Sequence, residues 1–425
     1  MNRGRNFKLL LAAILVVGFT LRVAYFIWAP RDYAAAYSDY DDIAQNLAAG
    51  KGFSLDKTIT GRSPAEPSGE VQTVPVVSRT PAYPFFLAAI YKLFGRRLRL
   101  VYLIQTVIDM LSALLFYFLT LRVASSARVA LVAVFIYALY VPFISQVAVV
   151  LNETLFNFLL LVFAFVAIHA VDKPSTRSFL AAGAALGLTA LCRPTTFFFP
   201  AVFLGAVLLK YRRRLGPLIV PSVAFVVGFV VLIGPWVVRN YVVLDYVGFV
   251  GSLAGEQVYG ALNQWRNSDT PLPVIPEQMQ ARLADKSDVE RNRILMREAL
   301  KEILRDPLDF ARSALRRTLL FWTGIGIGGA SFFYFPSNRA GAETCVFASV
   351  VNIVLIAFSV LAFVRFRGAW TRYSLIPLLL LGYFYVVHLP TYGPMRYSMP
   401  VIPFLMMFAS LGMVNLLGKA RTAPS

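Results

Sequence analysis

Ten apolar segments run through the 425-residue chain, and most of them have about the length that a helix needs to cross a lipid bilayer. About 20 mostly apolar residues span the roughly 30 Å of hydrocarbon. Backbone amides in lipid must be satisfied within the segment, so such segments fold as helices. We therefore predict an all-α polytopic membrane protein, one transmembrane domain over residues 1–425 with about ten to twelve spans. The ten segments are Leu9 to Ala29, Val101 to Leu121, Val129 to Val149, Thr154 to Ala170, Ser178 to Leu191, Phe197 to Leu209, Pro217 to Val238, Cys345 to Val364, Tyr373 to His388 and Ser398 to Gly418.

Composition excludes the other broad classes. The chain is 58% hydrophobic and 15% charged, against about 45–50% and about 25% in soluble domains. Disordered chains are poor in hydrophobic residues, and two Cys are too few for a disulfide scaffold.

Two of the predicted spans leave an alternative open. The fifth and sixth segments are short and meet at Arg193 and Pro194, so they form either a tight helical pair or one broken unit. The first segment has the length of a signal peptide, but Arg22 interrupts it and no small-residue cleavage site follows it. We interpret it as an uncleaved helix.

Two long segments, residues 30–100 and 239–344, separate the spans. Each contains one apolar stretch that is too short to cross, Pro81 to Phe94 and Thr318 to Ala330. We expect these stretches to be interfacial or re-entrant pieces buried against protein.

The charge distribution predicts the orientation. With the N-terminus in the cytoplasm, the short cytoplasmic segments hold 16 Lys or Arg and one acidic residue, Asp172. This is the positive-inside pattern, and it places both long segments outside. It also accounts for most of the net charge of +19, so no basic patch remains that would indicate nucleic-acid binding.

The first outer loop begins with a cluster of acidic residues. Asp39, Asp41 and Asp42 precede a pattern typical of a short surface helix that ends at Gly50 and Gly52. Acidic residues at a helix start favour the helix dipole, which is one explanation for them. Asp39 also lies where the chain leaves the first span, so a functional role is the alternative.

Further along this loop, residues 54–78 are rich in Ser, Thr, Pro and Gly and predict a flexible loop. Arg79 then leads into the apolar stretch at the depth of the lipid headgroups. Arginine there suits either a phosphate ligand or simple interfacial anchoring.

The second outer loop predicts two amphipathic helices lying on the surface. Ser287 and Glu290 form a capping box that begins a charged helix ending near Arg305. Asp306 and Pro307 begin the next helix.

Charged residues within spans are costly and suggest functional sites. Arg22 and Asp109 have opposite charges, and we expect them to neutralise each other. Glu153, Arg193, Arg239 and Arg396 lie at outer ends of spans. They either anchor the helices or share an anionic ligand.

A divalent cation is the one cofactor that the residue types leave open. His169 and His388 lie on opposite sides of the membrane in the predicted topology and cannot share a metal. A carboxylate site of Asp39, Asp41, Asp42 and Glu153 stays possible for a hard cation.

Together these motifs resemble the C-type (GT-C) membrane glycosyltransferases, in the branch with protein mannosyltransferases and lipid A aminoarabinose transferases. The resemblance covers nearly the whole chain, although the commoner acidic pair of the family is absent in its usual form. Its motifs, in order, are Asp39, Tyr40, Ile43, Ala44, Leu47 and Gly50; Arg79, Pro81, Tyr83, Pro84, Phe86 and Leu87; Gln105 and Asp109; Glu153 with Thr154, Leu155 and Phe156; Arg193 and Pro194; Pro235, Trp236, Arg239, Asn240 and Tyr241; and Arg396, Tyr397, Pro400 and Pro403.

The resemblance implies a sugar donor linked to polyprenyl phosphate and an acceptor hydroxyl on a lipid, glycan or protein. Asp39 would be the catalytic base, with Asp41 in reserve and Asp42 competing for the role. The donor phosphate would bind Arg79 first, then Arg396 and Arg239. Other expected substrate-binding residues are Glu153, Tyr40, Tyr83 and Tyr397.

The same resemblance implies transfer with inversion at the outer face of a membrane, which we expect to be the bacterial inner membrane. The rival prediction is a transporter or flippase of a lipid-linked or anionic solute, since such proteins share buried charges and outer arginines. Transporters often contain inverted repeats, and the sequence shows none.

Overall fold

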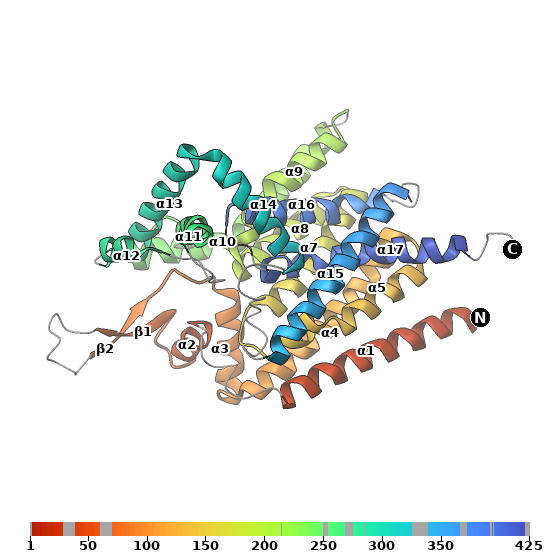
Figure 1. The fold of residues 1–425 in the computed structure, drawn as a ribbon, viewed down its shortest axis with the longest axis horizontal. Helices are drawn as coiled ribbons and strands as arrows, with labels where there is room; N and C mark the ends of the chain where they lie inside the picture. Colours follow the sequence, from red (N-terminus) through yellow and green to blue (C-terminus); the bar gives the residue numbers. More distant parts are fainter. Residues whose placement is uncertain are drawn as a thin grey trace.

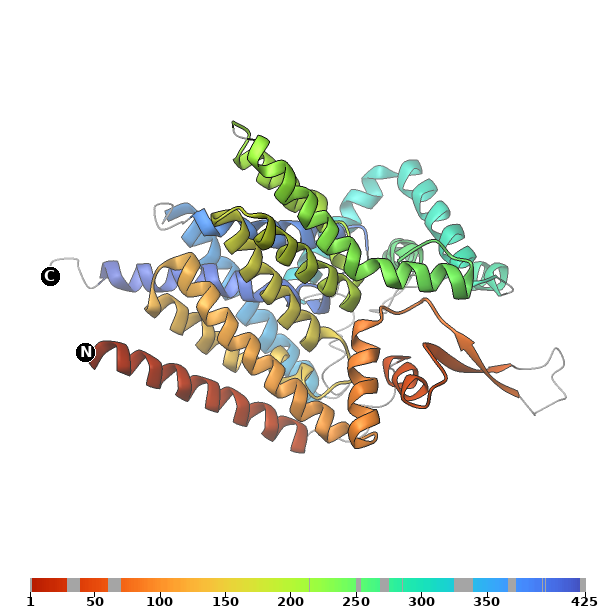
Figure 2. The same cartoon turned by 180° about the vertical axis from the view of Figure 1, so that it is seen from behind.

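The computed structural model describes residues 2–28, 39–59, 70–213, 215–249, 254–267, 275–284, 286–324, 339–365, 372–391, 393 and 395–420. Helices make up most of this part of the chain, with one two-stranded antiparallel hairpin (Figure 1). Both termini lie at one end of the helical bundle. The opposite end carries α2 (Asp39–Ala48), the hairpin, α11 (Ala254–Asn267), α12 (Glu277–Leu283) and α13 (Asp288–Arg305), and we call it the loop end (Figures 1 and 2).

The predicted all-α polytopic fold class is confirmed. Six helices in the described residues are long and apolar enough to cross a membrane, and five shorter apolar helices accompany them. The six long helices are α1 (Asn2–Trp28), α4 (Leu98–Ala124), α7 (Glu153–Asp172), α10 (Ile219–Leu244), α15 (Arg339–Arg365) and α17 (Ile402–Ala420). The five shorter ones are α3 (Ala82–Phe94), α5 (Ala127–Leu139), α8 (Thr176–Cys192), α9 (Phe199–Lys210) and α16 (Leu375–His388).

Two helix boundaries differ from the prediction. The third segment is not one helix to Val149, because α5 ends at Leu139 and α6 (Val141–Gln146) follows; Pro142 at its start has no amide hydrogen to continue the earlier helix. The second difference is that α10 continues past Val238 to Leu244, so Arg239 lies inside a helix. Of the two alternatives left open for the fifth and sixth segments, the structure has a pair of helices, α8 and α9, separated by a short 3-10 turn.

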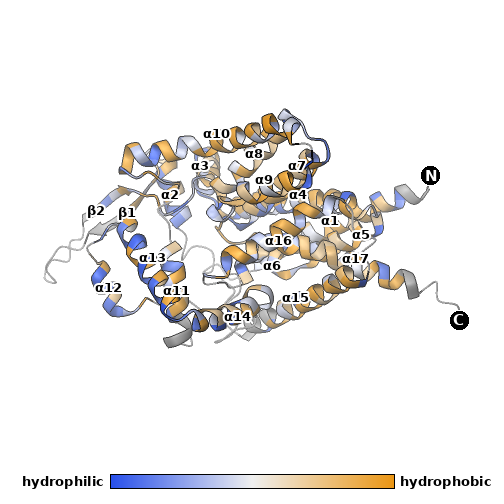
Figure 3. Ribbon diagram, turned by 90° about the horizontal axis from the view of Figure 1, so that it is seen from above, coloured by the Kyte–Doolittle hydropathy of each residue, from blue (hydrophilic) through white to orange (hydrophobic). Residues whose placement is uncertain are grey.

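The loop end holds the elements between the spans. They are α2 (Asp39–Ala48), β1 (Ser54–Ile59), β2 (Glu70–Pro75), α11 (Ala254–Asn267), α12 (Glu277–Leu283), α13 (Asp288–Arg305) and α14 (Pro307–Thr323). Polar residues gather on the helices of the loop end, whereas the bundle helices are largely apolar (Figure 3). α3 runs crosswise to α4 in both side views, as expected for an interfacial piece (Figures 1 and 2).

Both predicted helices of the second loop are present. Ser287 and Glu290 form the predicted capping box at the start of α13, and the Asp306 side chain accepts a hydrogen bond from the Asp309 amide at the start of α14. Thr318 to Thr323, the described part of the stretch predicted to be interfacial or re-entrant, continue α14. The rest of that stretch, 325–330, lies outside the described residues.

The prediction of a flexible loop over residues 54–78 is also wrong in part. Residues 54–59 pair with residues 70–75 in antiparallel register, with Ser54 opposite Pro75 and Ile59 opposite Glu70. The hairpin therefore gives the first loop a fixed framework beside α2.

Glycines set the closest helix contact in the bundle. A Cβ atom on Gly183 of α8 would overlap the Phe225 carbonyl of α10, and one on Gly228 of α10 would overlap the Leu180 carbonyl of α8. The two backbones can touch only because these positions lack side chains. We call this contact the glycine seam.

Candidate functional site

Tyr40, in the first turn of α2, lies at the centre of the charged residues that the sequence indicated. Its ring is 9% exposed and packs edge-on against the Tyr83 ring, with 5.3 Å between centroids. Its hydroxyl accepts a hydrogen bond from Asn152 Nδ2 at 3.1 Å. Burial raises the pKa of Tyr40 to about 12, and the charges of Arg79, Glu153, Arg396 and Arg193 all act on it. Residues spread over most of the chain therefore converge here.

Asp39 and Arg79 form an ion pair at the exposed side of this cluster. Arg79 Nη2 lies 2.9 Å from Asp39 Oδ2, and Arg79 Nε donates to the same oxygen at 3.1 Å. Both side chains remain partly open, at 42% exposure for Asp39 and 29% for Arg79. The guanidinium also lies over the Tyr40 ring, 5.4 Å from its centroid. A carboxylate and a cation are thus both accessible to a substrate.

Three chain segments hold this pair in place. Thr80 Oγ1 donates to the Cys192 carbonyl at 2.8 Å, and Asn152 Nδ2 donates to the same oxygen at 2.8 Å. These bonds tie the start of α3, the start of α7 and the end of α8 together. Neither Thr80 nor Asn152 was among the predicted site residues.

Glu153 lies at the buried side of the cluster, between two arginines. Arg396 Nε donates to Glu153 Oε1 at 2.6 Å, and Arg193 Nη1 lies 3.9 Å from the same oxygen. Glu153 is 1% exposed, and no described residue donates a hydrogen bond to Oε2. The group carries one negative and two positive charges, so it retains a net positive charge.

Tyr397 completes this group. The Arg193 guanidinium lies 4.9 Å from the centroid of the Tyr397 ring, and the Tyr397 ring stacks on His388 at 5.0 Å. Arg193, which was not among the residues expected to bind substrate, therefore belongs to the same cluster as Arg396 and Tyr397.

Asp41 points away from the Asp39 pair. Its carboxylate pairs with Arg96 at 2.6 Å and accepts hydrogen bonds from the Tyr91 hydroxyl at 2.6 Å and Gln45 Nε2 at 3.3 Å. Its side chain is 8% exposed. This environment connects α2 to α3 and leaves the carboxylate little opportunity to meet a substrate.

We expect Asp41→Asn to lower the free energy of unfolding by about 2 kcal/mol, since hydrogen bonds to charged groups contribute roughly 1.5–3 kcal/mol. The amide would lose the ion pair with Arg96 and disturb the bond from Tyr91. Thermal unfolding of the purified variant in detergent measures the loss. Unchanged stability together with abolished activity would instead make Asp41 the catalytic residue.

Arg239 and Tyr83, two residues predicted to bind substrate, form hydrogen bonds within the protein. Arg239 donates to the carbonyls of Phe53 and Val76 at 2.9 and 2.8 Å, which joins α10 to the hairpin. The Tyr83 hydroxyl donates to Gln105 Oε1 at 2.7 Å, and Tyr83 is fully buried. The geometry gives both a role in positioning the site.

Arg22 and Asp109 meet in the interior of the bundle, as the sequence suggested. Arg22 Nε lies 2.5 Å from Asp109 Oδ2, with both side chains fully buried. Tyr137 donates to Asp109 Oδ1 at 2.7 Å, and Arg22 Nη1 donates to the Ala138 carbonyl at 2.9 Å. The pair therefore connects α1, α4 and α5 away from the Tyr40 cluster.

An open polar cavity of about 640 Å³ lies along α2, beginning one helical turn after Asp39. Burial and the neighbouring charges of Asp41 and Asp39 raise the pKa of Asp42 in its wall. The other polar lining residues are Gln45, Asn46, Lys51, Asp56, Tyr91 and Arg96.

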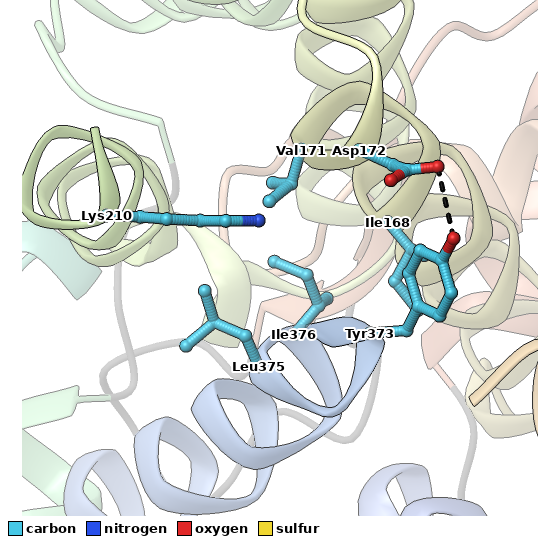
Figure 4. A pocket seen from close by; sticks show the side chains of 7 residues that line it. All are labelled: Ile168, Val171, Asp172, Lys210, Tyr373, Leu375 and Ile376. Carbon is cyan, nitrogen blue, oxygen red and sulfur yellow. Dashed lines mark hydrogen bonds between the residues drawn. The ribbon is translucent and has the colours of Figure 1, made fainter. Parts of the chain in front are cut away.

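A second pocket, at the far end of α7, is much smaller. It is lined by Asp172, Lys210 and Tyr373 among others, and Tyr373 donates to Asp172 at 3.2 Å (Figure 4). Its volume of about 10 Å³ suffices for about one water molecule. Since α7 has 20 residues, this pocket lies roughly 30 Å from Glu153 and is separate from the Tyr40 cluster.

The described residues offer poor ligands for a cation. No group of three His, Cys, Asp or Glu in this part of the chain could hold a metal ion. Asp39, Asp41 and Glu153 each pair with arginine, so the carboxylate site that the sequence left open does not assemble in the described structure. Cys192 is a buried free cysteine.

Comparisons with known proteins add one sequence match and a weak structural likeness. Residues 78–238 match the family model of the dolichyl-phosphate-mannose-protein mannosyltransferases. No curated protein matches the chain. ArnT from Cupriavidus metallidurans bound to undecaprenyl phosphate superposes with a TM-score of 0.41 and 15% identity, covering 99% of this chain and 79% of ArnT. The apo form of the same protein superposes with a TM-score of 0.39 and 14% identity, covering 96% of this chain and 77% of ArnT.

The matched segment runs from the residue before Arg79 to the last residue before Arg239, so it contains Arg79, Glu153 and Arg193 of the cluster around Tyr40. Over residues 78–238 the chain carries the sequence pattern of the dolichyl-phosphate-mannose-protein mannosyltransferase family, which confirms the resemblance predicted from its motifs.

Proposed function

We propose that this protein is an integral membrane glycosyltransferase that moves a sugar from a polyprenyl-phosphate donor to an acceptor hydroxyl. The observation that carries the proposal is the convergence of an accessible Asp39–Arg79 pair and the Glu153–Arg193–Arg396 group around Tyr40. Three of these residues lie in the segment that matches the mannosyltransferase family. The ArnT structure bound to undecaprenyl phosphate names the class of lipid that we propose as carrier.

In the proposed reaction, the Asp39 carboxylate takes the proton from the acceptor hydroxyl. The acceptor oxygen forms a bond to the anomeric carbon while the bond from that carbon to the phosphate oxygen breaks. The lipid phosphate leaves with the electron pair, and Arg79 and Arg396 stabilise its charge. A single displacement of this kind inverts the anomeric centre.

Glu153 positions this machinery. It holds Arg396 through a 2.6 Å hydrogen bond and Arg193 at 3.9 Å, and its single charge leaves the pair of arginines with a surplus for a phosphate. Tyr397 and Tyr40 form aromatic walls under Arg193 and Arg79. Arg239 and Tyr83 support the site through backbone and side-chain bonds.

The cavity along α2 is the proposed entry for the acceptor. It begins one turn after Asp39 and is lined by carboxylate, amide and cationic groups, the kinds of group that hydrogen-bond hydroxyls. An acceptor lying there would present a hydroxyl toward Asp39.

The distribution of charge supports a location for the site. The short segments predicted to be cytoplasmic hold 16 Lys or Arg, and the described parts of these segments lie at the end opposite the loop end. We propose that the two long loops, residues 30–100 and 239–344, and the site face the outside of a bacterial inner membrane.

Purified protein in liposomes containing a radiolabelled polyprenyl-phosphate sugar tests the proposal. Appearance of the label on a soluble or lipid acceptor supports transfer. Movement of intact donor across the bilayer, with no label on any acceptor, would support the transporter alternative instead.

We expect Arg79→Ala to weaken donor binding by roughly 10- to 100-fold, because a charge-assisted hydrogen bond is worth about 1.5–3 kcal/mol. Binding of a tritiated polyprenyl phosphate to purified protein measures this. Arg99→Ala is the matched control, since Arg99 is an exposed arginine on α4 at the same end of the bundle. Equal donor affinity in the Arg79 variant and the control would show that Arg79 does not bind the donor and only anchors the chain at the membrane interface.

A further inference from the structure

Arg317, on α14, is a buried cation without a partner for most of its guanidinium. The residue is 1% exposed. Its Nε donates to the Leu389 carbonyl at 3.1 Å, and its guanidinium lies 5.4 Å from the centroid of the Phe310 ring. Neither Nη1 nor Nη2 has a hydrogen-bond partner among the described residues.

The other deeply buried arginines of the described structure differ in this respect. Arg22 lies against Asp109, and Arg193 lies near Glu153. No described carboxylate forms a hydrogen bond with Arg317, although the charge of Asp309, about two helical turns earlier on α14, acts on it. The other buried arginines thus lie against a carboxylate, whereas the two Nη atoms of Arg317 have none in contact.

A buried charge without a counter-charge is costly, so chains rarely retain one. Burial lowers the pKa of Arg317 to about 10, and the side chain therefore stays protonated at neutral pH. The two Nη atoms present a flat pair of donors, and this arrangement matches the two oxygens of a phosphate or carboxylate.

The position of Arg317 connects it to the Tyr40 cluster. α14 packs against the short 3-10 turn Met395–Tyr397, which carries Arg396. One helical turn after Arg317, Phe321 stacks on His388 at 5.7 Å, and His388 stacks on Tyr397. Arg317 thus approaches, from the α14 side, the segment that also carries Arg396.

We propose that Arg317 binds an oxyanion, a phosphate or carboxylate group of a substrate, in a second anion subsite beside the turn that carries Arg396. The assignment of the oxyanion to a substrate rests on the proposed function, whereas the binding itself requires no transfer. Two molecules could supply the group, the lipid phosphate of the donor or an anionic acceptor.

Thermal unfolding of the purified full chain in phosphate-free detergent buffer, with inorganic phosphate as the probe, tests the subsite. Ionic strength is held constant with chloride. Phosphate should raise the Tm of the wild type and of Arg79→Ala, and the phosphate concentration needed should increase at least tenfold in Arg317→Met. Arg312→Met is the matched control, because Arg312 is an exposed arginine on the same helix. An equal response to phosphate in the Arg317 and Arg312 variants would overturn the proposal.

The Tm in the absence of phosphate separates this role from a structural one. If Arg317 binds an anion, its charge is unpaired in the absence of phosphate, so Arg317→Met should leave the Tm unchanged or raise it. If Arg317 instead stabilises the fold through its bond to Leu389 and its contact with Phe310, Arg317→Met should lower the Tm. In that case Arg317→Lys should restore neither the Tm nor phosphate binding. A lowered Tm with an unchanged phosphate response would contradict the proposal.

Saturation with farnesyl phosphate identifies the source of the oxyanion. If inorganic phosphate still stabilises the saturated wild type, the subsite serves an acceptor. If farnesyl phosphate removes the effect and itself binds at least tenfold more weakly to Arg317→Met, the subsite holds the lipid phosphate. If farnesyl phosphate binds equally to Arg317→Met and the control and no phosphate response exists, no subsite is present. Phosphate binding in a protein that transfers no sugar would overturn the proposed function alone.

Discussion

Asp39→Asn is expected to lower the rate of sugar transfer by about 10²- to 10⁴-fold, the usual contribution of a general base. The amide cannot take the proton from the acceptor hydroxyl. It keeps the size of the carboxylate and can still accept a hydrogen bond from Arg79, so donor binding should persist. Transfer of label from the polyprenyl-phosphate donor in liposomes measures the rate, and binding of tritiated polyprenyl phosphate measures the affinity.

Glu277→Gln is the matched control for this experiment, since Glu277 is an exposed acid in the first turn of α12 and lines neither the site nor the cavity along α2. We expect it to keep most of the activity. Normal turnover by Asp39→Asn, or equal losses in the two variants, would rule out Asp39 as the base.

Asp109→Leu is expected to lower the free energy of unfolding by about 3–5 kcal/mol, the cost of leaving one member of a buried ion pair alone. Arg22 would then lie inside the bundle with no counter-charge, and Tyr137 would lose its acceptor. Thermal unfolding in detergent, compared with the wild type under the same conditions, measures the change.

The double variant Arg22→Met with Asp109→Leu should recover most of that loss, because replacing a whole buried pair by apolar residues is often nearly neutral. The four proteins form a double-mutant cycle, and the coupling energy between the two residues should be at least about 2 kcal/mol. Additive losses in the double variant would show that the two side chains act independently.

The spans could be predicted from the sequence because apolar length alone determines them. Each of the ten predicted segments contains a helix, although the third is interrupted at Tyr140, and the capping residues Ser287 and Asp306 mark the starts of α13 and α14. The hairpin of residues 54–75 was missed because Ser, Thr and Gly in its sequence also favour loops. Its pairing depends on contacts with α2 and α10 that no local pattern records.

The sequence indicated which residues lie in the candidate site, but not which of them form ion pairs or hydrogen bonds with one another. In the sequence Asp39 and Asp41 are equivalent acids at one helix start. In the structure Arg79 reaches Asp39, whereas Arg96 and Tyr91 reach Asp41. Likewise Arg239 and Arg396 both follow apolar segments, but one binds backbone carbonyls and the other binds Glu153. Such choices depend on tertiary distances.

The glycine seam limits how a membrane lipid can approach the charged cluster. α8 ends one residue before Arg193, and along this helix its backbone touches that of α10 at Gly183 and Gly228. An isoprenoid or acyl chain is several ångströms thick and cannot pass between two backbones in contact. At the depth of these two glycines, the flank between α8 and α10 is therefore a closed wall to lateral diffusion from the bilayer.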